Sequence, residues 1–197
     1  GDVALGEGGT DTLYGNFDGD FLIGGMVIST TEELDESNQD TINLSSATAG
    51  VILDLSTTVT AGTGIYNGLY SQAMLVTDNA QFDYVRQIEY IIGSNWDDTF
   101  TGNASQNSIL AGDGDDIIYY TSGLDYYDGG NHTTTAGTQG STAAAVGGGD
   151  WISLAKETTT TVDFDLRNAS GTIGANITNS SAKVTNIENI IGYNGVQ

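Results

Sequence analysis

The apolar residues of this chain come in short runs of β-branched and aromatic side chains, not at the three- and four-residue spacing of an amphipathic helix. Runs such as VILDL at 51–55, YIIG at 90–93 and DIIYY at 116–120 are bounded by Gly, Asn and Asp. Short apolar runs between turn-forming residues are typical of buried β-strands. The pattern therefore predicts an all-β fold with almost no helix.

Polar residues recur every nine positions in the middle of the chain, and an apolar residue follows each of them two positions later. We expect each nine-residue step to make one half-turn of a coil, so that the apolar side chains stack on one another. Asp2, Asp11 and Asp20 begin the same pattern near the N-terminus. The polar positions of the central block are Asp98, Asn107, Asp116 and Asp125, the apolar ones are Phe100, Ile109, Ile118 and Tyr127, and Ile91 falls on the same apolar register.

A longer duplication overlies the short repeat. The segments QDTINLS, VILDLS and IEYIIGSN recur later, in the same order, as GDWISLA, TVDFDLR and IENIIGYN. We therefore predict two similar units, residues 1–92 and 93–197. The C-terminal IENIIGYNGVQ joined to the N-terminal GDVALGEGGTDTL would imitate the internal junction IEYIIGSNWDDTFTGN. The chain is then either one period of a longer array or a piece cut between similar modules.

Composition narrows the partners to cations. Four Lys and Arg stand against 26 Asp and Glu, for a formal charge of -22, which excludes nucleic acid and anionic membranes as partners. No apolar run reaches the roughly 18 residues of a membrane span. The absence of Cys and the single His exclude thiolate and His-rich zinc sites and His-based triads. HExxH, GxSxG and phosphate-cradling loops are missing as well, so we do not expect an enzyme.

The acidic register indicates metal binding. Stacked coils would bring Asp98 beside Asp116, and two unit charges about 4 Å apart repel by roughly 4 kcal/mol at an effective dielectric of 20. A divalent cation between them turns this repulsion into attraction, and carboxylates with backbone carbonyls suit Ca²⁺ better than zinc or copper.

Outside the repeats, Asp40 and Asp150 are expected at solvent-facing strand positions. Glu89 is expected at such a position too, and a ligand role is the alternative for it.

At Ala111–Tyr119 the sequence resembles the hemolysin-type nonapeptide G-G-x-G-x-D-x-U-x of secreted bacterial RTX proteins, with Ala for one Gly. The resemblance covers residues 1–25 and about 93–130 directly. It implies a right-handed parallel β-roll, a β-solenoid in which the first six motif residues form an ion-binding turn and the last three form a short strand. The pattern is broken where Asn107 replaces the acid and where Tyr120 and Thr121 replace a Gly pair.

The resemblance also implies the ligands of the calcium ions. Side-chain oxygens would come from Asp11, Asp18, Asp20, Asp98, Asn107, Asp116 and Asp125, and backbone carbonyls from Gly6, Gly8, Gly15, Ala111 and Asp113.

RTX proteins leave the cell by type I secretion, so the resemblance implies an extracellular protein at the bacterial cell surface. We expect a calcium-folded structural module of a surface-layer, adhesin or matrix protein that self-assembles with copies of itself or with neighbouring repeats. The alternatives are an accessory module of a secreted enzyme or toxin and a module that binds extracellular polysaccharide.

Overall fold

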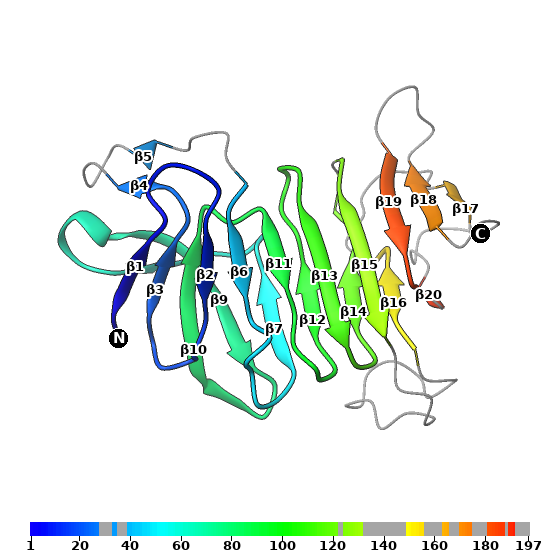
Figure 1. Ribbon diagram of the computed structural model, residues 1–197, viewed down its shortest axis with the longest axis horizontal. Coiled ribbons are helices and arrows are strands. Elements are labelled where there is room, and N and C mark those ends of the chain that lie inside the picture. Colours follow the sequence, from blue (N-terminus) through cyan, green and yellow to red (C-terminus); the bar gives the residue numbers. More distant parts are fainter. Residues whose placement is uncertain are drawn as a thin grey trace.

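Nearly all regular structure in the protein is β-strand (Figure 1). The computed structural model describes residues 1–27, 33–34, 39–121, 124–131, 149–155, 163–165, 170–174, 181–187 and 189–191. Within these ranges the only helical element is a short 3-10 turn, η1, at Gly64–Tyr66. The prediction of an all-β fold is confirmed.

The strands form two large sheets, A and B, and one small pair. Sheet A has ten strands in the order β1 (Val3–Leu5), β3 (Phe21–Ile23), β10 (Asp78–Arg86), β9 (Gly68–Leu75), β7 (Val51–Asp54), β12 (Thr99–Thr101), β14 (Ile117–Tyr119), β16 (Trp151–Ser153) and β20 (Asn189–Ile191), with β8 (Val59–Ala61) beside β9. Sheet B has eight strands in the order β17 (Asp163–Asp165), β18 (Ser170–Gly174), β19 (Ser181–Thr185), β15 (Tyr126–Asn131), β13 (Ser108–Asp113), β11 (Tyr90–Ile92), β6 (Thr41–Asn43) and β2 (Thr12–Tyr14). The small pair is β4 (Met26–Val27) with β5 (Glu33–Leu34).

Successive strands of the nine-residue repeat alternate between the two sheets. In sheet B, β11, β13 and β15 pair in parallel, with Ile91 opposite Ile109 and Ile109 opposite Tyr127. The intervening strands β12 and β14 pair in parallel in sheet A, with Phe100 opposite Ile118. Nine residues thus carry the chain from one sheet to the other, and eighteen bring it to the neighbouring strand. The predicted alignment of these five residues is confirmed within each sheet, with Ile91, Ile109 and Tyr127 in sheet B and Phe100 and Ile118 in sheet A.

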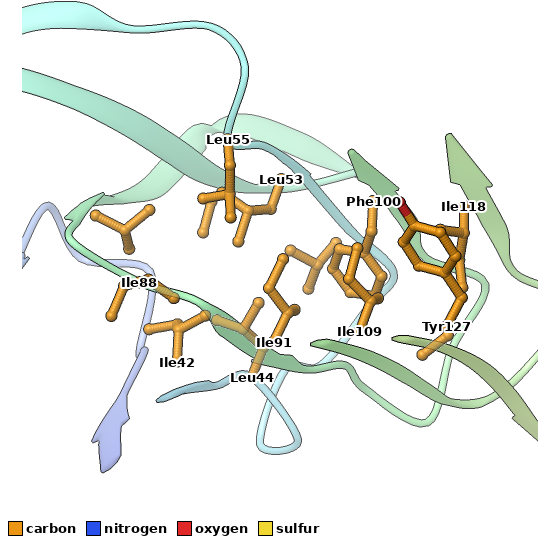
Figure 2. Close-up of a cluster of buried hydrophobic side chains, with 14 of the residues drawn as sticks. Ile42, Leu44, Leu53, Leu55, Ile88, Ile91, Phe100, Ile109, Ile118 and Tyr127 are labelled. Carbon is orange, nitrogen blue, oxygen red and sulfur yellow. The ribbon is translucent and has the colours of Figure 1, made fainter. Parts of the chain in front are cut away.

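Side chains from both sheets meet in one buried core (Figure 2). Ile91 and Ile109 of sheet B and Phe100 and Ile118 of sheet A have no exposed surface. Full burial of such a side chain stabilises the fold by roughly 1.5–3 kcal/mol. Each pair of successive strands adds one such side chain from each sheet to the core.

Antiparallel strands interrupt the parallel stacking once in each sheet. In sheet A, β9 is antiparallel to both β7 and β10, and β10 then pairs in parallel with β3. In sheet B, β18 is antiparallel to β17 and β19, and β19 pairs in parallel with β15. The sheets are therefore parallel elsewhere but contain one antiparallel excursion each, which the nine-residue period does not predict.

The two excursions belong to a larger correspondence between the halves of the chain. The pairings β2·β6, β6·β11, β7·β9, β9·β10 and β10·β3 recur in the same order as β14·β16, β16·β20, β17·β18, β18·β19 and β19·β15. For example, β6 pairs in parallel with β11 and β16 pairs in parallel with β20. Counterpart strands lie in opposite sheets.

Candidate metal site

An acidic residue precedes most strands of the stack, and its carboxylate accepts a backbone hydrogen bond from the neighbouring coil. On the sheet A side, the N–H of Val51 donates to Asp98 Oδ1 at 2.7 Å, that of Asp98 to Asp116 Oδ1 at 2.7 Å, and that of Asp116 to Asp150 Oδ1 at 2.8 Å. These residues form a ladder in which each carboxylate is held by the strand before it.

A second ladder follows the sheet B side. The N–H of Asp11 donates to Asp40 Oδ1 at 2.8 Å and that of Asp40 to Glu89 Oε2 at 2.9 Å. Further along, the N–H of Asn107 donates to Asp125 Oδ1 at 2.8 Å. Backbone dipoles therefore lie between successive acidic groups, and they lower the repulsion that stacked carboxylates would otherwise suffer.

The expectation that Asp40 and Asp150 face solvent is wrong. Asp40 is 4% exposed and Asp150 is fully buried. Each stands at the start of a strand and accepts a backbone N–H from the neighbouring coil, as Asp116 does. Glu89, whose carboxylate accepts the N–H of Asp40, is half-buried and belongs to the same ladder.

Glycines provide the space into which the ladder carboxylates fold. A Cβ on Gly93 would lie 2.7 Å from Asp98 Oδ2, and one on Gly6 would lie 3.1 Å from Asp11 Oδ2. The contact at Gly93 is closer than side-chain carbons tolerate, and the contact at Gly6 would force the carboxylate to move by a few tenths of an ångström. The glycine five positions before each of these acids is thus explained by packing, whether or not its carbonyl binds an ion.

The ladder on the sheet A side carries an electrostatic cost. Burial, together with the nearby charges of Asp98 and Asp150, raises the pKa of Asp116 to about 9. Burial also raises the pKa of Asp98 to about 6. Asp116 Oδ2 is buried and accepts no hydrogen bond. Protonation or a bound cation would therefore lower the electrostatic cost of burying these carboxylates.

Asp125 differs from Asp116 because both of its oxygens are engaged. Oδ1 accepts the N–H of Asn107, and Oδ2 accepts the hydroxyl of Tyr127 at 2.7 Å. Burial raises the pKa of Asp125 and raises that of the Tyr127 hydroxyl. The Tyr127 hydroxyl thus supplies Asp125 Oδ2 with the hydrogen bond that Asp116 Oδ2 lacks.

Among the described residues, one group of three carboxylates lies close enough together to hold a metal ion. Oxygens of Asp18, Asp20 and Asp83 all lie within 4.8 Å of one another. Asp18 and Asp20 belong to the turn between β2 and β3, and Asp83 lies on β10, the parallel neighbour of β3. The three side chains are exposed, nearly buried and fully buried, so the group opens to solvent on the Asp18 side.

Asp83 fixes the conformation of the turn that carries the other two. Its Oδ2 accepts the N–H groups of Asn16 and Phe17 at 2.9 and 2.8 Å, and its Oδ1 accepts those of Gly19 and Asp20 at 3.3 and 3.1 Å. The turn contains positive φ angles of 63° at Phe17 and 91° at Gly19. Glycine adopts such an angle freely, whereas Phe17 needs such support. A carboxylate accepts about four hydrogen bonds, so Asp83 acts on an ion chiefly as a fixed negative charge.

Asp18 and Asp20 have fewer backbone hydrogen bonds than Asp83, because Asp20 Oδ1 accepts the N–H of Asp2 and Asp18 is exposed. The pKa of Asp18 is raised, first by its hydrogen bond with Asp20 and then by burial and by the charges of Asp20 and Asp83. A hard divalent cation between Asp18 and Asp20 would offset the repulsion between their carboxylates. The donor set is all oxygen, which suits calcium or magnesium and not zinc or copper.

The sequence had indicated Asp18 and Asp20 but not Asp83. Asp83 stands outside the nine-residue period, yet Asp83-Tyr84-Val85 repeats the polar-aromatic-apolar order of Asp20-Phe21-Leu22. The two segments pair in parallel, with Tyr84 opposite Phe21. This local likeness was the available signal.

The other predicted ligands lie apart from this group. Asp11, Asp98, Asn107, Asp116 and Asp125 stand in the two ladders. Asp113 is exposed and accepts the side-chain amide of Asn131 at 3.0 Å. Ala111 is buried with its carbonyl against Gly93, Gly8 is exposed in the turn before β2, and Gly15 packs against Leu44 and Asp83.

No protein-family model and no curated protein matches the chain. None of the described residues forms a helix with the length and hydropathy of a membrane span.

Proposed function

We propose that this chain is a calcium-binding structural module of the hemolysin-type repeat class, a β-roll that calcium folds and stiffens outside the cell. The observation that carries the proposal is the convergence of Asp18, Asp20 and Asp83 at a turn of a stack whose period is nine residues. The alternation of strands between two sheets and the acid before most strands support it.

Calcium suits the site better than magnesium does. One carboxylate is exposed and adjustable, another is nearly buried, and the third is fully committed to backbone N–H groups. Calcium accepts irregular sets of six to eight oxygens and retains water, whereas magnesium demands a near-ideal octahedron. In this site, Asp18 and Asp20 would hold the ion and Asp83 would hold the turn.

Charge links the ion to folding. A chain with a net charge of -22 repels itself when it becomes compact, and an ion that binds only the folded form stabilises that form by mass action. Extracellular calcium modules have dissociation constants of about 10⁻⁴–10⁻³ M. Such an affinity would leave the protein less ordered in a low-calcium cytosol and fold it after export.

The test measures calcium binding by isothermal titration on two matched variants. Asp18→Asn removes one open carboxylate and should weaken calcium binding at the triad about tenfold. Asp113→Asn removes an equally exposed carboxylate that lies outside the triad, and should leave the affinity of that site unchanged. Equal affinities in both variants and the parent chain would refute the assignment of the ion to this turn.

Circular dichroism completes the test. Excess chelator should reduce the β signal and the resistance to protease, and millimolar calcium should restore both. A spectrum and a digestion pattern indifferent to calcium would refute the folding role even if an ion binds.

A further inference from the structure

In the part of the chain that the structure describes, each end of sheet A is a strand with a single neighbour. Within the described ranges β1 pairs only with β3, and β20 pairs only with β16. The two edges lie at opposite ends of the long axis of the molecule (Figure 1). Val3 is 42% exposed, and Ala4, which packs on the core, is only partly buried because no further rung covers it.

The middle of the same molecule shows how such edges fit together. There β11 and β13 pair in parallel, with Tyr90 opposite Ser108 and Ile92 opposite Leu110. On the far side of this junction β11 pairs with β6, and β13 pairs with β15.

Each terminal edge reproduces one side of that junction. The pair β16·β20 has the order and direction of β6·β11, with Ile152 opposite Ile190 where Ile42 is opposite Ile91. The pair β1·β3 has the order and direction of β13·β15. In both β1 and β13, the strand runs parallel to the strand that begins 18 residues later.

We propose that a second copy of this chain docks head to tail, with β20 of one copy beside β1 of the next. The strands pair in parallel with Asn189 opposite Val3, Ile190 opposite Ala4 and Ile191 opposite Leu5, which continues sheet A across the joint. This goes beyond the calcium function, since it needs folded strands at the two ends but no ion at the triad.

The backbone groups of β1 face the way the joint requires. Phe21 N–H donates to the carbonyl of Asp2, and Gly6 N–H donates to the carbonyl of Ile23. Parallel strands alternate the side to which their backbone groups point, so Ala4 faces β3 while the N–H and C=O groups of Val3 and Leu5 point to the open edge.

The internal junction uses the corresponding groups. Ser108 N–H donates to the carbonyl of Glu89, and Gly93 N–H donates to the carbonyl of Leu110, both at 2.8 Å. Ser108 and Leu110 are the counterparts of Val3 and Leu5. The edge of β1 therefore offers the donor and the acceptor that the internal partner of β11 offers.

Sheet B would need one more strand at the same joint. In the middle of the molecule β12 lies between β7 and β14, and the counterparts of these neighbours are β17 and β2. Fifteen residues separate Ile92 from Ser108, whereas six follow Ile191 and two precede Val3. Seven residues, in the place of Thr99–Ser105, would complete the connection between two copies.

The joint is heterologous, because different edges of the two copies meet, and a contact of this kind that does not close into a ring produces open chains of copies. The charge of -22 on each copy opposes association at low ionic strength. Assembly should therefore strengthen as salt or calcium is added.

The first experiment measures association by sedimentation at rising protein concentration in about 0.15 M salt, with calcium and with chelator, alongside circular dichroism. Val3→Pro removes an outward N–H from β1 and none of its bonds to β3, and should weaken association about tenfold. Thr12→Pro makes the same change at the first residue of β2, whose open edge faces the place of the missing sheet B strand and so gains no partner in two unlinked copies. This variant should associate like the parent chain.

A monomeric parent chain with intact β signal at every concentration would overturn the proposal, as would equal association of the two proline variants. If the parent chain associates but binds no calcium, the result would count against the proposed function and not against the joint.

The second experiment needs no spontaneous association. Two copies are joined by a seven-residue linker with the sequence of Thr99–Ser105, and a control fusion carries a Gly/Ser linker of the same length. The first fusion should unfold in one transition at a higher temperature than the single chain and the control. Identical melting of both fusions would overturn the proposed joint.

Discussion

The backbone N–H of Asp98 donates to the carboxylate of Asp116, eighteen residues further along the chain, at 2.7 Å. Asp98 in turn accepts the N–H of Val51 at 2.7 Å. A side chain that looks like a metal ligand in the sequence is thus also the polar tie between two coils, and the two roles are separable by mutation.

Asp116→Ala should lower the free energy of unfolding by about 1–3 kcal/mol in chelator, because it strands the buried N–H of Asp98. The measurement is urea unfolding followed by circular dichroism. Asp113→Ala is the control, because Asp113 is exposed and its carboxylate accepts a hydrogen bond from the side-chain amide of Asn131. Equal losses in the two variants would contradict a structural role for the ladder.

Stability in chelator should fall as pH rises from about 4 to about 9. Burial raises the pKa of Asp116 to about 9 and that of Asp98 to about 6, both above the ordinary 3.8. Such groups take up protons on folding, so their contribution is full below the unfolded pKa and is lost as pH rises through the folded one.

Urea midpoints at several pH values check this dependence. Asp116→Asn keeps an acceptor for the Asp98 N–H but cannot ionise, so it should flatten the curve between about pH 6 and pH 9. A midpoint that rises over this window in the parent chain would refute the sign.

Gly93→Ala should be among the most damaging single changes. Its Cβ would lie 1.9 Å from the Ala111 carbonyl and 2.7 Å from Asp98 Oδ2, so two coils must separate, at a cost of about 3 kcal/mol or more. Gly19→Ala meets no atom within 4 Å, and only its φ of 91° opposes the change, at about 1–2 kcal/mol. Thermal unfolding of the two variants should rank them in this order, and the reverse order would contradict the packing argument.

Asp83→Ala should affect both stability and calcium binding, whereas Asp18→Asn should affect binding alone. The first change removes an acceptor of four backbone N–H groups, of which that of Gly19 also donates to the Phe82 carbonyl, and should cost about 2 kcal/mol or more. The second alters an exposed side chain. Urea unfolding in chelator, paired with calorimetric titration, separates the two effects; an unchanged stability of Asp83→Ala would refute its role in the turn.

The regular part of the stack could be predicted from the sequence because its signal is local. From Ile91 to Tyr127 every ninth residue is apolar, and the strands keep this spacing. The antiparallel strands β9 and β10 carry no such period, and their place between β7 and β3 depends on pairing across long sequence distances. Asp83 was missed for the same reason.

Asp40 and Asp150 were misjudged because inserted residues hide their register. Asp98 follows its glycine by five positions, but Asp40 follows Gly24 by sixteen and Asp150 follows Gly129 by twenty-one. In space the pairs are alike, since a Cβ on Gly24 or Gly129 would lie 2.7 or 2.6 Å from the carboxylate. The number of residues between the glycine and the acid therefore differs from pair to pair, but the contact between them is the same.

The glycine and its acid therefore mark an insertion site. Between Gly24 and Asp40 and between Gly129 and Asp150 the segments differ in length, yet the contact between the two residues is the same. Gly102 and Asn107 make a similar contact with only four residues between them. A foreign peptide or a small domain grafted there should be displayed on the surface while the underlying stack remains whole.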